Sequence, residues 1–269
     1  MGTITVVGTG GIIEGNLGAS DINVNLDPVL TLDGSADYLT ATTADFRGGD
    51  SAGAITAWIK TSGDGNYDTI FASADTATDE YFIRLQLVGT YLQVQHKDAD
   101  TTIYTVRGGT VMNDGSWHHV ALVSSGSAIS LYVDGVAETL TVIAGSNNGD
   151  WFGDMTGSKL DNITIGNLTH NSATDYFDGS IADVRYYNAS LTAAQVATLA
   201  SKINAETSTI SNRKHWWKLN DGEITGGTNY EDYGDTSDID MVATSIVAGN
   251  IDYDAFSVNV QDGGVRLAD

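Results

Sequence analysis

The sequence predicts an all-β protein, a jelly-roll sandwich of two antiparallel sheets. Three observations predict this fold. Short runs of β-branched and aromatic residues recur along the 269 residues, 31 glycines and a single proline punctuate them, and long helical patterns are scarce. One short helix and a strand-rich C-terminal arm complete the expected architecture.

The clearest strands are residues 117–124 and 128–133, which are rich in Val, Ile, Tyr and Trp. Asp134-Gly135 follows them and predicts a tight turn, because glycine adopts positive φ without steric cost. Two strands alone are marginally stable in water, so the rest of the chain must supply more of the sheet.

The other strands follow from period-2 alternation and from turn residues at short intervals. Residues 81–88 and 91–95 alternate most clearly between apolar and polar side chains. The expected strands are 29–33, 36–40, 53–60, 67–72, 80–88, 90–96, 101–106, 162–166 and 179–187. Residues 143–160 form a long polar stretch, which predicts a loop of the length that often carries function.

A helix is expected over residues 193–203. Thr192 stands at the N-cap position and Gln195 follows three residues later, which is the pattern of a capping box. Val196, Leu199 and Ile203 then share one apolar stripe at helical spacing.

The chain divides into a lead-in segment (1–28), the sandwich (29–205) and a C-terminal arm (206–269). Residues 246–262 resemble residues 12–27 in their alternating pattern, so the chain begins and ends with versions of one segment. A strand-rich arm without its own core needs a partner. We expect the arm to pack on the same domain or on a neighbouring subunit, which favours a homo-oligomer.

Composition excludes several classes of partner. The chain has 35 acidic and 12 basic residues, a formal charge of −23, so its surface repels nucleic acid and anionic lipid. No apolar run approaches the roughly 20 residues of a membrane span, and the N-terminus lacks the basic region of a secretion signal. Without cysteine there are no disulfides and no thiolate metal sites.

One block of sequence resembles a known family. Residues 115–121, Gly-Ser-Trp-His-His-Val-Ala, followed by Leu-Tyr-Val-Asp-Gly at 131–135, are similar to the central hairpin of laminin-G-like, pentraxin-like members of the concanavalin A-like lectin/glucanase group. Blocks at 32–39 and 55–60 precede it, and blocks at 163–166 and 177–187 follow, in the same order. The resemblance covers roughly residues 29–203 and implies the sandwich fold. It leaves the function open, because this fold hosts lectins, adhesion modules, glycanases and structural parts.

The residues argue against catalysis. Glycan-cleaving proteins place two carboxyl groups around one bond, and the glycanases that the resemblance points to carry them as Glu-x-Asp-x-x-Glu on one strand. That motif is absent, and no two glutamates are close together on one strand. The adjacent His118 and His119 point to opposite faces of a strand and cannot share one metal ion. We therefore expect no enzyme.

The resemblance also implies calcium at the rim of the sandwich, bound by hard oxygen ligands. The candidate ligands lie in two loops: Asp64, Asn66, Asp68, Asp154 and Asp161. Asp64-x-Asn66-x-Asp68 imitates the start of a calcium loop but lacks its downstream glycine and glutamate. The alternative interpretation is an acidic surface that is simply solvated.

Glycan binding would use exposed aromatic rings on rim loops beside hydrogen-bonding side chains. The candidates are Trp151, Tyr67, Tyr176 and Asn148. Trp58 and Trp117 lie inside strand blocks and are expected in the core. Trp216-Trp217 should place one ring inward and one at an interface.

Together these features predict a non-enzymatic recognition or surface-assembly protein. The leading hypothesis is a bacteriophage virion component, a capsid decoration or a tail or fibre protein on the virion surface. Its expected partners are virion proteins or its own copies through the arm, and cell-surface or environmental glycans. One alternative is an adhesin-type carbohydrate-binding module, extracellular or on a bacterial surface. The other is a glycoside hydrolase with atypical carboxylates.

Overall fold

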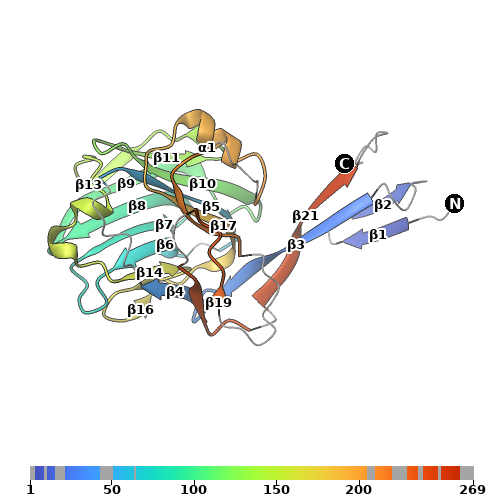
Figure 1. Cartoon of the computed structure of the whole chain (residues 1–269), viewed down its shortest axis with the longest axis horizontal. Helices are drawn as coiled ribbons and strands as arrows, with labels where there is room; N and C mark the ends of the chain where they lie inside the picture. Colours follow the sequence, from blue (N-terminus) through green and yellow to red (C-terminus); the bar gives the residue numbers. More distant parts are fainter. Residues whose placement is uncertain are drawn as a thin grey trace.

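The computed structural model describes residues 4–8, 11–15, 22–42, 51–63, 65–204, 210–219, 229–235, 239–247 and 250–260. Two antiparallel sheets pack face to face, and the predicted all-β sandwich is confirmed (Figure 1). Within the described residues one α-helix is present, α1 (Ala193–Leu199).

The first sheet has eight strands among the described residues. Their order is β12 (Val136–Ala137), β11 (Ile129–Val133), β10 (Trp117–Ser124), β5 (Gly53–Lys60), β17 (Asp178–Tyr187), β3 (Ile22–Asp33) and β21 (Ile251–Val260), and β18 (Arg213–Trp217) also pairs with β17. The hairpin predicted around residues 117–133 lies here as β10 and β11, with Leu122 opposite Leu131. Asp134 and Gly135 take the positive φ angles that the turn requires.

The second sheet has nine strands in the same described part of the chain. Their order is β13 (Thr141–Gly145), β9 (Thr101–Val111), β8 (Tyr91–Asp98), β7 (Phe82–Val88), β6 (Asp68–Ala74), β14 (Asn162–Ile165), β4 (Tyr38–Thr42), β20 (Met241–Thr244) and β19 (Asn229–Tyr230). Two short hairpins form separate two-stranded sheets: β1 (Ile4–Gly8) with β2 (Gly11–Gly15), and β15 (Leu168–Thr169) with β16 (Ala173–Thr174).

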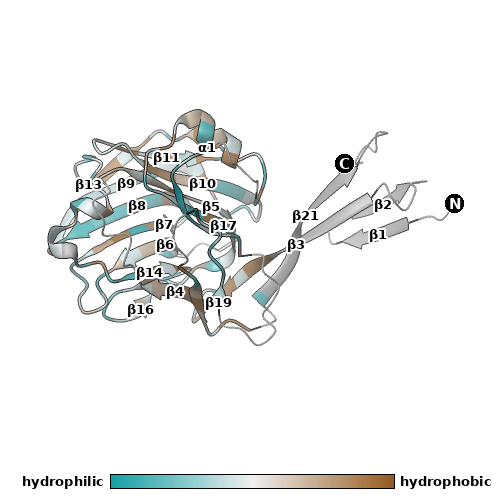
Figure 2. Ribbon diagram, viewed as in Figure 1, coloured by the Kyte–Doolittle hydropathy of each residue, from teal (hydrophilic) through white to brown (hydrophobic). Residues whose placement is uncertain are grey.

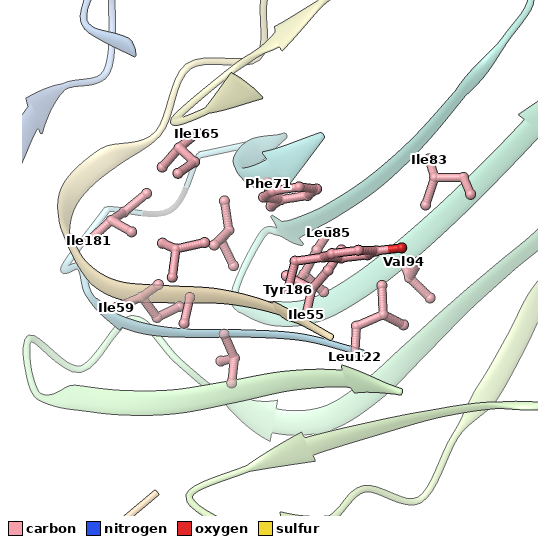
Figure 3. Packing of buried hydrophobic residues seen from close by; sticks show 14 of the residues in the cluster. Ile55, Ile59, Phe71, Ile83, Leu85, Val94, Leu122, Ile165, Ile181 and Tyr186 are labelled. Atoms are coloured by element: carbon pink, nitrogen blue, oxygen red, sulfur yellow. The ribbon is translucent and has the colours of Figure 1, made fainter. Parts of the chain in front are cut away.

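The apolar core lies between the two sheets. Figure 3 shows Ile55 and Ile181 of the eight-stranded sheet packed toward Ile83, Leu85 and other residues of the nine-stranded sheet, and each is at most 1% exposed. Each buried side chain of this size contributes about 1.5–3 kcal/mol relative to an exposed one. The alternation read from the sequence therefore has a physical basis, since one face of every central strand faces this core.

The helix α1 keeps its predicted start and ends earlier than predicted. The Gln195 N–H donates to Thr192 Oγ1 at 3.3 Å, and Thr192 N–H donates to Gln195 Oε1 at 2.8 Å, which confirms the capping box. Val196 and Leu199 pack on the outer face of the eight-stranded sheet. The helix stops at Leu199 rather than at 203.

The loop predicted at 143–160 is partly wrong, because residues 143–145 belong to β13 and pair with β9. This edge strand is mostly exposed, so it carries no apolar alternation that a sequence pattern could reveal. Two short 3-10 turns follow, Phe152–Asp154 and Thr156–Ser158.

The predicted C-terminal arm contributes strands to both sheets. β18 pairs with β17, and β20 pairs with β4. Trp217 is fully buried in the main core, as expected for the inward ring. Trp216 points the other way, where its Nε1–H donates to Asp183 at 2.7 Å and the Arg185 guanidinium lies 4.3 Å from its ring.

The two segments of similar sequence at the ends of the chain pair with each other. β21 runs antiparallel to β3, with Val258 opposite Val24 and Val260 opposite Ile22. Figure 1 shows this two-stranded ribbon extending beyond the sandwich. Among the helices of the described residues, none has the length and hydrophobicity needed to span a bilayer.

Candidate functional site: a polar face of the nine-stranded sheet

The site begins with the alternation of β7. Ile83, Leu85 and Leu87 point into the core, so Arg84 and Gln86 lie on the opposite, outer face of the sheet. The same alternation on β8 places Leu92 and Val94 in the core and leaves the positions between and after them outside. Figure 2 shows β8 as a largely hydrophilic strand between β9 and β7.

Strand register brings these outer residues into two rows. Gln86 lies opposite Gln93 of β8, which lies opposite Arg107 of β9. Arg84 lies opposite Gln95 in the neighbouring row. Residues directly opposite on one face have Cβ atoms about 4.5–5.5 Å apart, so the five side chains are neighbours on this side of the sheet. We name Arg84, Gln86, Gln93, Gln95 and Arg107 the polar face.

Gln86 is the most unusual member of the polar face. It is 0% exposed, and neither its amide oxygen nor its amide nitrogen has a hydrogen-bond partner among the described residues. Gln93 beside it is 6% exposed. A buried polar group without a partner costs about 1–3 kcal/mol, and such groups require a specific explanation. A ligand that brings hydroxyl groups to this position would supply the missing hydrogen bonds.

Arg84 is fixed by its neighbours. Its Nη1 donates to the Asp175 carboxylate, and its Nε and Nη2 donate to Gln95 Oε1 at 3.2 and 2.9 Å. Its guanidinium lies 5.2 Å from the ring of Tyr67 and 5.2 Å from the ring of Phe82. Burial lowers the pKa of Arg84, and the Asp175 carboxylate opposes that shift. The guanidinium therefore stays charged and rigid.

Aromatic side chains flank the polar face on two sides. Tyr67, which stacks on Arg84, is 46% exposed and offers its ring to solvent. Tyr91 is half-buried and lies 5.2 Å from the Arg107 guanidinium at the other end of the row. The hairpin β15–β16 covers the β6 side, where Leu168 packs with Phe82 on the same outer surface. The polar face is thus bounded by the rings of Tyr67 and Tyr91 and by the β15–β16 hairpin.

The four predicted glycan-binding residues have different environments in the structure. Tyr67 lies at the edge of the polar face, and Tyr176 is half-buried next to Tyr38, with ring centroids 6.2 Å apart. Asn148 is exposed, and its side chain accepts a 3.2 Å hydrogen bond from the Asp150 backbone within its own loop.

Trp151 is not an exposed ring, and its expected stacking role is wrong. It is 0% exposed and packs edge-on against Phe152, with ring centroids 4.8 Å apart. The 3-10 turn after it folds the polar loop back over the core. Conversely, the expected core residues Trp58 and Trp117 are half-buried on the outer face of the eight-stranded sheet.

The predicted calcium ligands make separate contacts in different parts of the fold. Asp161 accepts hydrogen bonds from Thr76 N–H and Oγ1–H at 2.9 and 2.8 Å, and Asp154 accepts one from Trp151 N–H at 2.8 Å. Asp68 is buried at the start of β6, Asn66 is exposed, and Asp64 lies outside the described residues. Within the described part of the chain no three His, Cys, Asp or Glu side chains are grouped to hold a metal ion. Calcium binding stays a prediction.

The two adjacent histidines occupy different environments, as their alternation predicts. His119 is buried against Trp58, with ring centroids 5.5 Å apart, and burial lowers its pKa to about 3. His118 bonds Asp134 at 2.8 Å and Asp114 at 3.2 Å. Both therefore support the fold of the central hairpin.

Sequence reasoning missed the polar face itself. The signal was present in residues 83–87 and 92–95, where the positions that alternate with the core residues are arginine and glutamine. A glutamine amide donates and accepts hydrogen bonds and a guanidinium donates them, so these positions carry several hydrogen-bonding groups on one side of the sheet. The row containing Arg107 emerges only from the pairing of β8 with β9.

Comparison with known proteins identifies the superfamily to which the fold belongs. The profile described as the concanavalin A-like lectin/glucanases superfamily matches residues 33–197, more than half of the chain. A search of curated proteins finds no match.

Among solved structures, a candidate carbohydrate-binding protein from Bacteroides ovatus is similar with a TM-score of 0.58 and 16% identity, over 90% of this chain and 61% of that one. The chain thus spans about three fifths of the length of that protein. The CBM40 domain of the Ruminococcus gnavus IT-sialidase has a TM-score of 0.53 and 14% identity, over 67% of this chain and 99% of the domain. A structure of that domain bound to α2,3-sialyllactose gives the same TM-score at 13% identity, over 66% of this chain and 98% of the domain. At these identities the likeness is one of fold.

Proposed function

The chain belongs to the concanavalin A-like lectin/glucanase superfamily, and from this premise we propose that it is a non-catalytic carbohydrate-binding protein whose polar face holds the sugar. The observation that carries the proposal is the buried amide of Gln86, which has no partner among the described residues and stands in a row with Gln93 and Arg107. An amide both donates and accepts, and a sugar hydroxyl does the same. The exposed ring of Tyr67 supplies an apolar surface beside them.

Binding without cleavage fits the charges on this face. A retaining glycosidase needs two carboxyl groups about 5–5.5 Å apart around the scissile bond. Asp175 at the edge of the polar face is held by Arg84, and the neighbouring positions in the rows are glutamine, threonine and arginine. This set of side chains orients a sugar and offers no acid and nucleophile pair.

We further propose that the β3–β21 ribbon attaches the sandwich to a larger assembly. A two-stranded ribbon has two edges with unpaired backbone groups, which are a template for pairing with another chain. Copies of this chain or proteins of a bacteriophage virion are the partners this proposal favours, with the sandwich displayed on the virion surface. An extracellular adhesin-type module would use the same polar face and a different attachment.

Sedimentation of the full chain and of a chain ending at residue 247 tests the attachment. The shorter chain keeps β18 and β20 and loses β21. We expect the full chain to self-associate, or to bind particles in an electron-microscopy assay, and the shorter chain to stay monomeric and folded. Identical masses and no particle binding for both would contradict this part of the proposal.

A glycan array with labelled protein, in calcium and in chelator, tests the sugar-binding function. Gln93→Ala and Tyr67→Ala should each weaken every hit by about tenfold or more, because each removes a contact at the polar face. Asn148→Ala is the matched control and should change nothing. An array that stays blank with and without calcium, for folded protein, would refute carbohydrate binding.

A further inference from the structure

Arg107 has a different environment from Arg84, although both belong to the polar face. Arg84 is neutralised by Asp175. Arg107 forms no ion pair with the described residues, and its guanidinium lies 5.2 Å from the ring of Tyr91. The guanidinium is half-buried and has no carboxylate partner in the described part of the chain, although the sequence has 35 acidic residues.

Glu138, an acidic residue that contacts the strand carrying Arg107, is engaged by the backbone of that strand. Glu138 accepts hydrogen bonds from the Gly109 and Thr110 N–H groups at 2.6 and 2.9 Å and from Thr110 Oγ1–H at 2.6 Å. Those contacts hold the carboxylate on the backbone after Arg107. The N–H groups of the Arg107 guanidinium can therefore donate to a ligand from outside the chain.

Register places this guanidinium at the end of the row that contains the unsatisfied amide. Arg107 lies opposite Gln93, and Gln93 lies opposite Gln86. Tyr91 supports the guanidinium by a cation–π contact, which limits its rotation. The row thus contains one charged guanidinium, which donates hydrogen bonds, and two amides, which donate and accept them.

We propose that the bound glycan carries a carboxylate and that Arg107 binds it. This inference rests on the proposed carbohydrate-binding function and names its substrate class, an acidic sugar. Guanidinium matches a carboxylate with two parallel N–H···O bonds, which gives both affinity and orientation. The amides of Gln86 and Gln93 then hold hydroxyl groups of the same or the next sugar ring.

Calorimetry with matched pairs of ligands tests the proposal. The probes are an oligogalacturonide and its methyl ester, and 3′-sialyllactose and lactose, so each pair differs in a carboxylate. We expect at least one acidic probe to bind about 10- to 100-fold more tightly than its neutral partner, the range expected for a charged hydrogen-bonded contact.

Two variants of the full chain separate specificity from stability. Arg107→Gln should abolish the preference for the acid, and Arg107→Lys should keep part of it, because a lysine keeps the charge and loses the fork. Lys159→Gln is the control. It removes the positive charge that follows the second 3-10 turn and contacts the ring of Tyr81, and it should keep the preference. Melting curves confirm that each variant is folded.

The outcomes are distinguishable. Binding of neutral glycans at the polar face with no preference for acids, or a preference that survives Arg107→Gln, would overturn the acidic-sugar inference and leave the proposed function standing. A folded protein that binds neither these probes nor any glycan on the array would overturn both.

Discussion

The amide of Gln86 allows a sharp prediction, because it should strengthen glycan binding while it lowers the stability of the fold. Gln86→Met replaces the amide by an apolar side chain of similar length and volume, a change that cores tolerate well. In the native protein both amide atoms lack partners among the described residues, and the side chain is 0% exposed. Removing this unsatisfied group should raise the free energy of unfolding by about 1–3 kcal/mol.

The expected change is measurable by two methods. Urea unfolding followed by tryptophan fluorescence gives the free energy directly, and for a chain of this size about 1 kcal/mol corresponds to roughly 2–4 °C in Tm. The same variant should lose glycan affinity by about tenfold or more, because the sugar hydroxyls lose their amide partner.

Gln95→Met is the matched control on the same face. Gln95 Oε1 accepts two hydrogen bonds from Arg84, so its loss should destabilise the fold by about 1–3 kcal/mol. If Gln86→Met is instead less stable than the wild type, the amide has hydrogen-bond partners in solution. The reasoning that assigns its partners to a ligand would then be refuted.

Three further predictions concern titration and a buried ion pair. Burial lowers the pKa of His118, but the hydrogen bonds and charges of Asp134 and Asp114 outweigh it and raise the pKa above 6.5. The stability that His118 contributes is therefore fully present below pH 6.5 and lost as pH rises through the raised folded-state pKa, so the Tm difference between wild type and His118→Asn should shrink as pH rises above 6.5. Burial lowers the pKa of His96 to about 4, so the stability that this neutral histidine contributes is lost as pH falls from 6.5 toward 4. His96→Phe should therefore reduce the fall in Tm over this pH range, and an unchanged fall in Tm would contradict the prediction. Asp183→Ala leaves Arg185 buried without its carboxylate and should cost about 3–5 kcal/mol in urea unfolding, and a loss below about 1 kcal/mol would show that the pair is not needed.

The core strands could be predicted from the sequence because each has one face against the apolar interior. β7 and β8 begin and end within two residues of their expected limits, and their alternation correctly separates core from outer residues. The N-cap of α1 was likewise predictable, since Thr192 and Gln195 form their contacts within one turn. Such features depend on neighbours in the sequence.

The tryptophans show where that reasoning fails. Trp151 sits in a polar stretch, yet a 3-10 turn folds it into the core, while Trp58 alternates onto an outer face that the sequence does not distinguish from the inner one. Both outcomes depend on which surfaces the tertiary fold covers. The polar face was missed for the same reason, because the position of Arg107 beside Gln93 depends on pairing between strands with two register shifts.

The most direct test of the central claim is the response of side-chain N–H resonances to a glycan in isotope-labelled protein. With the best ligand from the array, the account predicts that the amide resonances of Gln86, Gln93 and Gln95 and the Arg107 Nε–H shift together on titration. The amide of Asn148 and the indole N–H of Trp58 should stay in place. Shifts at Asn148 or Trp58, with the polar face unmoved at saturating ligand, would contradict the claim that this face binds the sugar.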